Sequence, residues 1–310
     1  MDLFKRETRI DFIGKRRIAA VVSLLLIAIA IASLAIRGLN FGLDFTGGTL
    51  VEVGYEAPVE LGEVRTDLAD AGLDGAVVQY FGTSRDVLIR IPPDTATGER
   101  VGDRVLAAVQ DDGTGAELRR VEFVGPQVGE ELKEKGGLAM LYALAGILAY
   151  VAFRFEYRFA LGSVAALVHD VTITLGFFSV TGVEFDLTVL AALLAVIGYS
   201  LNDTIVVFDR IRENFVRVRK GTPMEVANMS INQTLGRTLM TSVTTLVVVV
   251  ALAVLGGELI KPFAEALVVG IVIGTFSSVF VASTLALALG VSKEDLIPPE
   301  KEGADQEELP

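Results

Sequence analysis

Three ionisable side chains stand in stretches that are otherwise apolar enough to cross a membrane. Asp203 follows Asn202 in the run IGYSLNDTIVVF, and His169 and Asp170 interrupt an earlier apolar run. A carboxylate at the centre of a spanning helix costs about 2.5–3.5 kcal/mol on insertion scales, so such groups face a bundle interior, a partner subunit or water. Intramembrane acids and imidazoles are typical of proton relays and ion pathways. Asp203 is therefore the first candidate for proton coupling.

A cation is available to Asp203 in the next apolar run, which Arg237 opens in the stretch RTLMTSVTT. If the two helices are neighbours, Arg237 can reach inward and pair with Asp203. Each residue also has a simpler interpretation. Asp203 can be a fixed polar contact between helices, and Arg237 can be an anchor that snorkels to the membrane surface. Candidate polar support for the pair, or plain helix–helix hydrogen bonding, comes from Asn202, His169 and Asp170.

The composition excludes several other kinds of chemistry. The chain has 310 residues, 52% of them hydrophobic, a mean hydropathy of +0.55 and a formal net charge of −12. It has no cysteine and a single histidine, which excludes disulfides, thiolate sites and multi-histidine metal sites. The acidic balance argues against a nucleic-acid partner. We expect neither a cofactor nor a metal, and no enzymatic activity.

The elements that must position these residues are apolar runs near 20 residues long, the length needed to span a bilayer. Six such runs predict six transmembrane helices, at about 18–36, 138–153, 159–180, 187–208, 239–255 and 262–289. The first run has small residues and a basic flank, as a cleaved signal peptide does, but its apolar core is longer than the usual ~7–15 residues. An uncleaved helix is the favoured interpretation.

Orientation follows from lysine and arginine in the short links. The segment 1–17, the link RFEYR and the link after the fourth run are basic, and all three fall on one side under a six-helix count. We therefore expect both termini to be cytoplasmic, with a cytoplasmic helical hairpin at 209–237, within the 138–290 bundle, and an acidic cytoplasmic tail at 291–310. In the hairpin, Thr222, Pro223 and Glu225 predict a helix start with a capping box.

The remaining segment, 37–137, has the size of a domain and lies outside the membrane. Alternating and helical periods predict the order β-α-β-β-α-β, the ferredoxin-like split motif, with the two middle strands joined at TSR (83–85). Nothing in it resembles a catalytic site, so a binding or mechanical domain is expected. The predicted fold class is thus a polytopic α-helical membrane protein with one extracytoplasmic α+β ferredoxin-like domain.

Five motifs together resemble the SecF family, the smaller membrane subunit of the SecD–SecF complex of bacterial protein export, in the resistance-nodulation-division superfamily. They are FGLDFTGGT, VGPQVGEEL, HD, GYSLNDTIVVFDRIREN and RTLMTS, and the resemblance covers nearly the whole chain. It implies a bacterial plasma (inner) membrane protein that uses the proton motive force, with SecD, to promote export of unfolded polypeptides through the SecYEG channel. YajC is a further implied partner. The family's proton-path aspartate falls on Asp203 and its arginine on Arg237.

Two other functions are compatible with the same residues. One is half of a proton-driven exporter of small molecules or lipids from the same superfamily. The other is a translocon assembly factor without any proton role, in which Asp203 is a packing contact. Sodium also remains open as the coupling ion, because a buried carboxylate can serve either cation.

Overall fold

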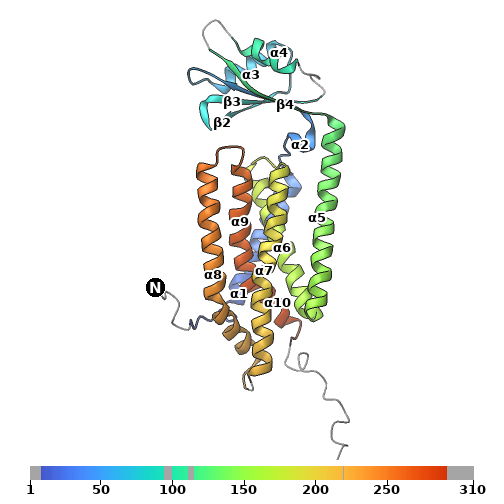
Figure 1. Cartoon of the computed structure of the whole chain (residues 1–310), viewed down its shortest axis with the longest axis vertical. Helices are drawn as coiled ribbons and strands as arrows, with labels where there is room; N and C mark the ends of the chain where they lie inside the picture. The colour runs from blue at the N-terminus through green and yellow to red at the C-terminus, as the bar shows by residue number, and fades with distance from the viewer. Residues whose placement is uncertain (1–7, 94–99, 111–114, 219, 292–310) are drawn as a thin grey trace, which may run out of the picture.

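The computed structural model describes residues 8–93, 100–110, 115–218 and 220–291. They form a bundle of long helices with a small α/β domain at one end, the domain end (Figure 1). The opposite end, called the far end below, holds the start of the helix Arg16–Ile36 and the turn between the helices Leu187–Arg217 and Pro223–Leu255. The first seven residues of the predicted basic segment, and the predicted acidic tail from residue 292, lie outside the described residues.

The α/β domain contains a four-stranded antiparallel sheet in the order β2-β3-β1-β4. Its strands are β1 (Gly48–Gly54), β2 (Val77–Phe81), β3 (Thr83–Ile91) and β4 (Glu117–Val124). Helices α3 (Leu61–Asp70) and α4 (Val101–Val109) cover the face away from the bundle and bury side chains such as Val51, Leu68 and Val105. The predicted element order is confirmed.

The predicted joint between the two middle strands is wrong by a few residues. Thr83 to Arg85 belong to β3, and the chain reverses at Gly82, whose φ of 76° lies in the left-handed region. Glycine occupies that region without a steric penalty, whereas Thr, Ser and Arg do not. The glycine, rather than the polar triplet after it, therefore makes the turn.

Six helices of spanning length are present in the described part of the chain, which confirms the predicted fold class. They are α1 (Arg16–Ile36), α5 (Pro126–Arg154), α6 (Tyr157–Thr181), α7 (Leu187–Arg217), α8 (Pro223–Leu255) and a last span of α9 (Lys261–Ser277), the π-helical turn η1 (Ser278–Ala282) and α10 (Ser283–Ala288). At ~1.5 Å per residue, the shortest is long enough to cross a hydrocarbon core.

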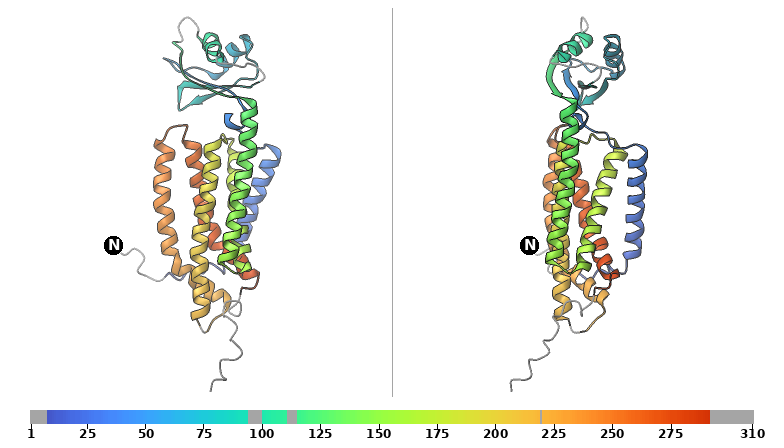
Figure 2. Two further views of the ribbon diagram at one scale, coloured as in Figure 1. Left: turned by 45° about the vertical axis from the view of Figure 1, so that its right-hand side comes forward. Right: turned by 90° about the vertical axis from the view of Figure 1, so that its right-hand side faces the viewer.

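Two of these helices extend well beyond the apolar runs. Helix α5 begins at Pro126 and rises out of the bundle to the sheet (Figure 2). Helix α8 begins at Pro223, where the predicted capping box is confirmed. Glu225 N donates to Thr222 Oγ1 at 3.3 Å, and Thr222 N donates to a Glu225 carboxylate oxygen at 2.8 Å. Proline suits the first helical position because its missing N–H has no partner there anyway.

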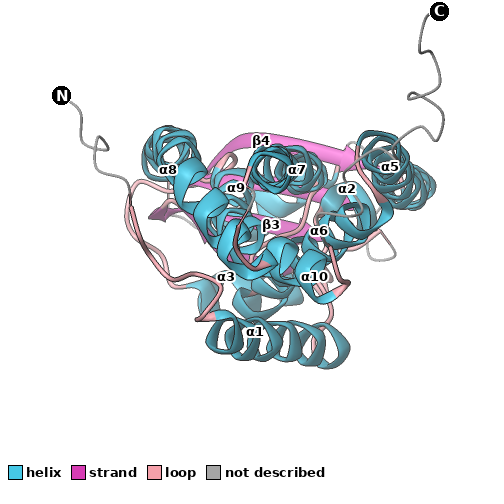
Figure 3. Ribbon diagram, turned by 90° about the horizontal axis from the view of Figure 1, so that it is seen from below, coloured by secondary structure: helices cyan, strands magenta, loops and turns pink. Residues whose placement is uncertain are grey.

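The spanning helices divide into an inner and an outer set. In the most apolar window of α6 and of α7, 56% of the residues are buried, compared with 11% for α1 and α5. Seen along the bundle, α1 lies apart at the edge (Figure 3). Many leucines, isoleucines and valines are exposed on α1 and α8. Such a dense apolar surface is stable only in an apolar solvent. Polar residues on α6, α7 and α9 are therefore the ones shielded from lipid.

A corner joint attaches the domain to the bundle. The four-residue helix α2 (Leu43–Thr46), which the sequence did not predict, packs against α5 just before β1. Gly47 and Gly48 connect α2 to β1 with φ of 69° and 122°, and Gly129 of α5 approaches Gly47 so closely that an added Cβ would lie 2.9 Å from the Gly47 nitrogen. Only glycine permits this contact between backbones.

Polar contacts complete the joint on its other side. Arg90 of β3 pairs with Glu184, in the link between α6 and α7, at 3.0 Å and donates to the carbonyl oxygen of Phe41 at 2.9 Å. Asp44 of α2 accepts a hydrogen bond from Leu187 N, the first residue of α7, at 3.1 Å. Burial raises the pKa of Glu184, and the Arg90 charge opposes that shift. The domain is thus tied directly to the start of α7.

Candidate functional site

A layer of polar side chains crosses the middle of the inner helices, centred on Asp170 of α6. Only 1% of Asp170 is exposed. One carboxylate oxygen, Oδ1, lies 2.9 Å from His169 Nδ1, and the other, Oδ2, accepts hydrogen bonds from Ser200 Oγ of α7 at 2.5 Å and Ser277 Oγ of α9 at 2.7 Å. One carboxylate therefore binds three inner helices together.

The same layer continues around η1. Ser278 Oγ lies 2.9 Å from Thr204 Oγ1 of α7, and it is also within 3.3 Å of the Ser200 carbonyl oxygen. Close packing permits these contacts, because a Cβ on Gly274 would lie 2.9 Å from Ser200 Cβ. Gly274 thus serves close packing, whereas Ser277 and Ser278 serve as hydrogen-bonding groups.

Asp203 lies one turn after Ser200 on α7, and only 3% of it is exposed. Unlike Asp170, it is poorly satisfied, because its Oδ2 has no hydrogen-bond partner. The polar groups that interact with it, Ser242 through a side-chain hydrogen bond and Arg237 through its charge, both belong to α8. A buried carboxylate oxygen without a donor is costly in its ionised state. Asp203 is thus a buried acid with one carboxylate oxygen left without a partner.

Arg237 is on the helix next to Asp203, as the predicted pairing requires, but the described structure shows no ion pair between the two side chains. Arg237 is exposed, as is Asn202. Asn202 therefore does not join the polar layer, although it adjoins Asp203 in sequence. Of the candidate polar residues, the structure brings together His169 and Asp170, buries Asp203 on α7 one turn after Ser200, and leaves Asn202 and Arg237 exposed.

The layer also contains four residues for which the sequence predicted no role in a site: Ser200, Thr204, Ser277 and Ser278. A weak signal was present, because Ser200 and Thr204 lie four residues apart on α7, a spacing that places two side chains on one face. No group of three or more metal-ligating side chains occurs among the described residues. The layer can hold protons or a single small cation between oxygen atoms, but it lacks the ligand set of a metal centre.

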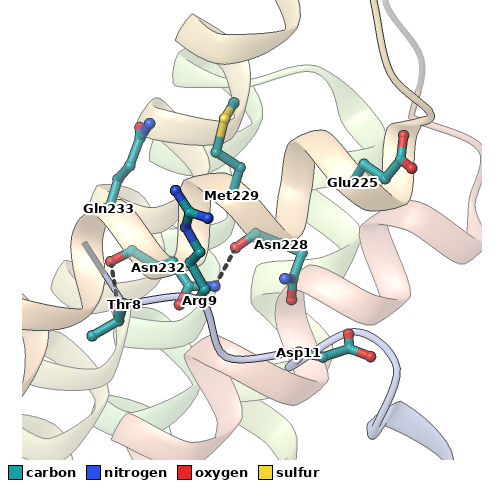
Figure 4. A pocket seen from close by; sticks show the side chains of 8 residues that line it. All are labelled: Thr8, Arg9, Asp11, Glu225, Asn228, Met229, Asn232 and Gln233. Carbon is teal, nitrogen blue, oxygen red and sulfur yellow. Dashed lines mark hydrogen bonds between the residues drawn. The ribbon is translucent and has the colours of Figure 1, made fainter. Parts of the chain in front are cut away.

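A separate polar site lies at the far end, where the segment before α1 crosses the start of α8 (Figure 4). Asn228 and Asn232, one turn apart on α8, bind the backbone of Ile10 and Phe12. Asn232 Oδ1 accepts from Ile10 N at 2.8 Å, and Asn228 Oδ1 accepts from Phe12 N at 2.8 Å. These contacts recognise backbone only, so they attach the segment without offering any acid–base chemistry.

Comparison with known proteins gives consistent matches. Residues 104–292 match the family model "Protein export membrane protein SecD/SecF, C-terminal", and residues 32–59, which include Gly47 and Gly48, match the "SecD/SecF GG Motif". The chain is 55% identical to protein translocase subunit SecF of Vibrio alginolyticus, with 99% of each chain covered. It is 53% identical to that of Pseudomonas aeruginosa, with 94% of this chain and 95% of the relative covered.

Two solved structures share the fold. The crystal structure of SecDF, a translocon-associated membrane protein from Thermus thermophilus, matches with a TM-score of 0.83 at 41% identity, covering 91% of this chain and 39% of that one. SecDF in a super-membrane-facing form matches with a TM-score of 0.69 at the same identity, covering 93% and 39%. The chain therefore spans about two fifths of these solved proteins, and its fold matches the first structure more closely than the second.

Proposed function

The chain belongs to the SecD/SecF family of protein-export membrane proteins, and we propose that it couples proton movement to export through Asp203. It is a multi-pass membrane component of protein transport, and its relatives support partnership with SecD. In our proposal it acts without enzymatic chemistry in the bacterial inner membrane, with SecD and the SecYEG channel as partners and YajC as a further one. The complex pulls or releases unfolded chains on the outer side.

The single observation that carries the proposal is the buried, half-satisfied carboxylate of Asp203. A polar contact that only fixed the packing would have all its oxygen atoms paired, as Asp170 has. Asp203 instead has one oxygen without a donor and a cation on the adjacent helix that is not bound to it. Its charge is thus adjustable, and gain or loss of a proton changes the attraction between α7 and α8.

The energy available is small, so the moving element must be nearly balanced between two states. A proton that crosses the field gains ~2.3 kcal/mol per 100 mV. In the proposed cycle, protonation of Asp203 weakens its attraction to Arg237, α7 and α8 repack, and the corner joint carries the change to the outer domain. Support comes from the joint itself, since Asp44 holds the first residue of α7.

The orientation in this proposal places the far end and both termini in the cytoplasm. Basic residues gather at that end, including Lys15, Arg16 and Arg17 at the start of α1 and Arg154 at the end of α5. The positive-inside rule favours this arrangement. The α/β domain then lies outside the membrane, where an exported chain emerges.

We propose further that SecD covers the face of α7 and α8 on which Asn202 and Arg237 are exposed. Lipid is a poor environment for an amide or a guanidinium, and the same face of α7 carries the small exposed residues Ala191, Ala195 and Gly198, which permit close helix approach. Because the chain has no cysteine, single cysteines at position 195 or 198 report this contact cleanly. A disulfide to a cysteine on a spanning helix of SecD is expected, and efficient labelling by a lipid-soluble probe instead would contradict the assignment.

The test of the function compares Asp203→Asn with Asp209→Asn. Asp209 is two turns further along α7, but it is 43% exposed and pairs with Arg154 at 2.9 Å. In cells that lack the native gene, we expect Asp203→Asn to slow the appearance of a secreted precursor, with normal protein abundance and normal retention of SecD. Asp209→Asn should export like the wild type. Equal export by both variants would refute proton coupling at Asp203 and favour an assembly role.

The coupling ion is decided in the same system. Inverted membrane vesicles containing the wild type are given either a proton gradient or a sodium gradient of equal size. Stimulation of export by the proton gradient alone, lost in Asp203→Asn, is the expected result. Stimulation by sodium in the absence of a proton gradient would assign the site to sodium instead.

A further inference from the structure

We propose that His169 and Asp170 form a second proton-binding pair, which exchanges protons with the far end through a groove between α1 and α6. The inference rests on the proposed function, since it adds a second station to a proton path. It assigns the proton to one atom, His169 Nε2, and gives α1 a role as the wall of the exchange route.

The hydrogen bonds around Asp170 determine the protonation pattern of the pair. Asp170 receives hydrogens from Ser200 and Ser277 on one oxygen and faces His169 Nδ1 with the other. An ionised carboxylate only accepts hydrogen bonds, so an arrangement of three donors suits its charged form. His169 then carries its hydrogen on Nδ1, which leaves Nε2 as the basic nitrogen. Asp170 also stabilises the imidazolium that forms when Nε2 takes up a proton, as a carboxylate does beside a catalytic histidine.

His169 Nε2 is free to do this. Only 4% of His169 is exposed, and Nε2 has no hydrogen-bond partner. A histidine kept only to hold helices together would be expected to use both ring nitrogens once it is buried. Here one nitrogen is bound within the polar layer, while the other has no partner, in a residue that lines a groove.

The groove has a volume of about 860 Å³ and runs between α1, α6 and the last helices η1 and α10. It exists because α1 touches α6 near the domain end, where Ser33 and Ser179 bond at 2.8 Å and Ala30 packs on Gly176. Towards the far end the groove lies between α1 and α6, and Arg16 lines it at that end. The lining is mostly apolar, and a proton route along it depends on its few polar groups.

Those polar groups share one property with His169. Ser23 Oγ of α1 and Thr284 Oγ1 of α10 line the groove, are buried and have no hydrogen-bond partner. These three buried polar atoms, on three different helices whose residues line one cavity, are the groups available to waters that enter the groove. The groove therefore suits proton exchange between His169 and the end of the bundle marked by Arg16.

The charged groups around the pair are few. Arg16 is the charged residue of α1 that lines the groove, and the acid of α7 in its buried middle is Asp203, one turn after Ser200. On the described part of α9 to α10 the charged residues are Lys261 and Glu265, both in the first two turns at the domain end. Arg154 of α5 is bound to Asp209 at the far end of the bundle. A proton on His169 thus meets one strong local partner, Asp170.

The pair is linked to Asp203 through one turn of α7. Ser200 donates to Asp170, and Asp203 follows three residues later on the same helix. When His169 becomes positive, its stronger attraction for Asp170 competes with the hydrogen bond from Ser200. A change at the pair is thereby felt at the turn that carries Asp203, so the two stations act on one helix.

The decisive variant is His169→Asn. An asparagine amide can donate to Asp170 from a position close to that of Nδ1, but it has no basic nitrogen. We expect normal abundance and normal retention of SecD, with the proton-gradient-stimulated part of export in inverted vesicles reduced about tenfold or more. We also expect the pH dependence of the remaining export to differ from that of the wild type, because one of the two proton-binding groups is gone. Wild-type rate and pH profile in this variant would overturn the proposal.

A second variant tests the groove without touching the pair. Ser23→Ala combined with Thr284→Val removes both hydroxyls, and export should slow at least about threefold because the exchange route loses its polar groups. Ser33→Ala is the matched control, since Ser33 belongs to the same helix but bonds Ser179 outside the groove. Equal rates for the double variant and the control would overturn the exchange route, even where His169→Asn accumulates poorly.

The outcomes for Asp203 and His169 separate the two proposals. Loss of coupling in Asp203→Asn together with normal export in His169→Asn would refute the second station alone. Normal export in both variants would refute the proposed function itself.

Discussion

The close contact between Gly129 and Gly47 allows a quantitative test of the corner joint by the substitution Gly129→Ala. The new Cβ would lie 2.9 Å from the Gly47 nitrogen and 3.3 Å from the Phe45 carbonyl carbon. Both are backbone atoms, so α2 and α5 must separate by about half an ångström, and overpacking of this kind costs about 1–3 kcal/mol. Alanine also favours the helix by up to about 1 kcal/mol relative to glycine. The net change is therefore close to zero or destabilising.

The matched control is Gly146→Ala on the same helix, because a Cβ there meets no atom within 4 Å. This control gains the helix preference alone, so the two variants should differ by about 1–3 kcal/mol in the free energy of unfolding in mixed micelles. We expect slower export from Gly129→Ala and wild-type export from Gly146→Ala. If Gly129→Ala is as stable and as active as Gly146→Ala, the joint is not a tight contact and does not transmit force.

Three further predictions concern the polar groups. Arg90→Gln removes the charge that opposes the raised pKa of Glu184. The folded state then holds the Glu184 proton more strongly than the unfolded state does. Unfolding measured at a series of pH values should therefore show stability falling as the pH rises above the ordinary pKa near 4.5. In the double variant with Glu184→Gln this pH dependence should disappear. Asp170→Asn leaves two serine donors facing an amide, and we expect a loss of about 1–3 kcal/mol by the same assay, whereas a neutral result would show that the polar layer does not hold the inner helices. Asn228→Ala should release the segment before α1 and speed amide exchange at Phe12, with Asn232→Ala showing the same effect at Ile10.

The parts of the fold that the sequence predicted are those set by local pattern. Each of these patterns depends on neighbours within a few residues: the apolar runs of spanning length, the capping box at Thr222 and the alternation in the strands of the α/β domain. Helix α2 was missed because four residues between glycines are too short to show any period. The turn at Gly82 was displaced because the polar triplet after it also reads as a turn.

The site was predicted less completely, because its contacts join distant segments. Ser277 is 107 residues from Asp170 in the chain, and nothing near Ser277 in the sequence indicates which acid it binds. Asn202 and Asp203 illustrate a second limit. Adjacent residues on a helix point about 100° apart, so one can be buried and the other exposed, and the pattern of a mostly apolar helix does not decide which. Arg237 was placed correctly on the neighbouring helix, but its pairing with Asp203 remains a prediction.

Helix α7 is the element through which both proposed proton stations can act on the outer domain. Its first residue, Leu187, is held by Asp44 of the joint, and its middle carries Ser200 and Asp203. Sixteen residues separate Leu187 from Asp203, about 24 Å of helix. A continuous helix of that length moves as a rod, so repacking at Asp203 reaches the joint undiminished unless the helix bends. The π-helical turn η1 lies against α7 at the level of Ser200 and Thr204, and such turns are common at functional sites of helices. In the proposed cycle α7 therefore transmits the movement, while the last span contributes its π-helical turn to the polar layer.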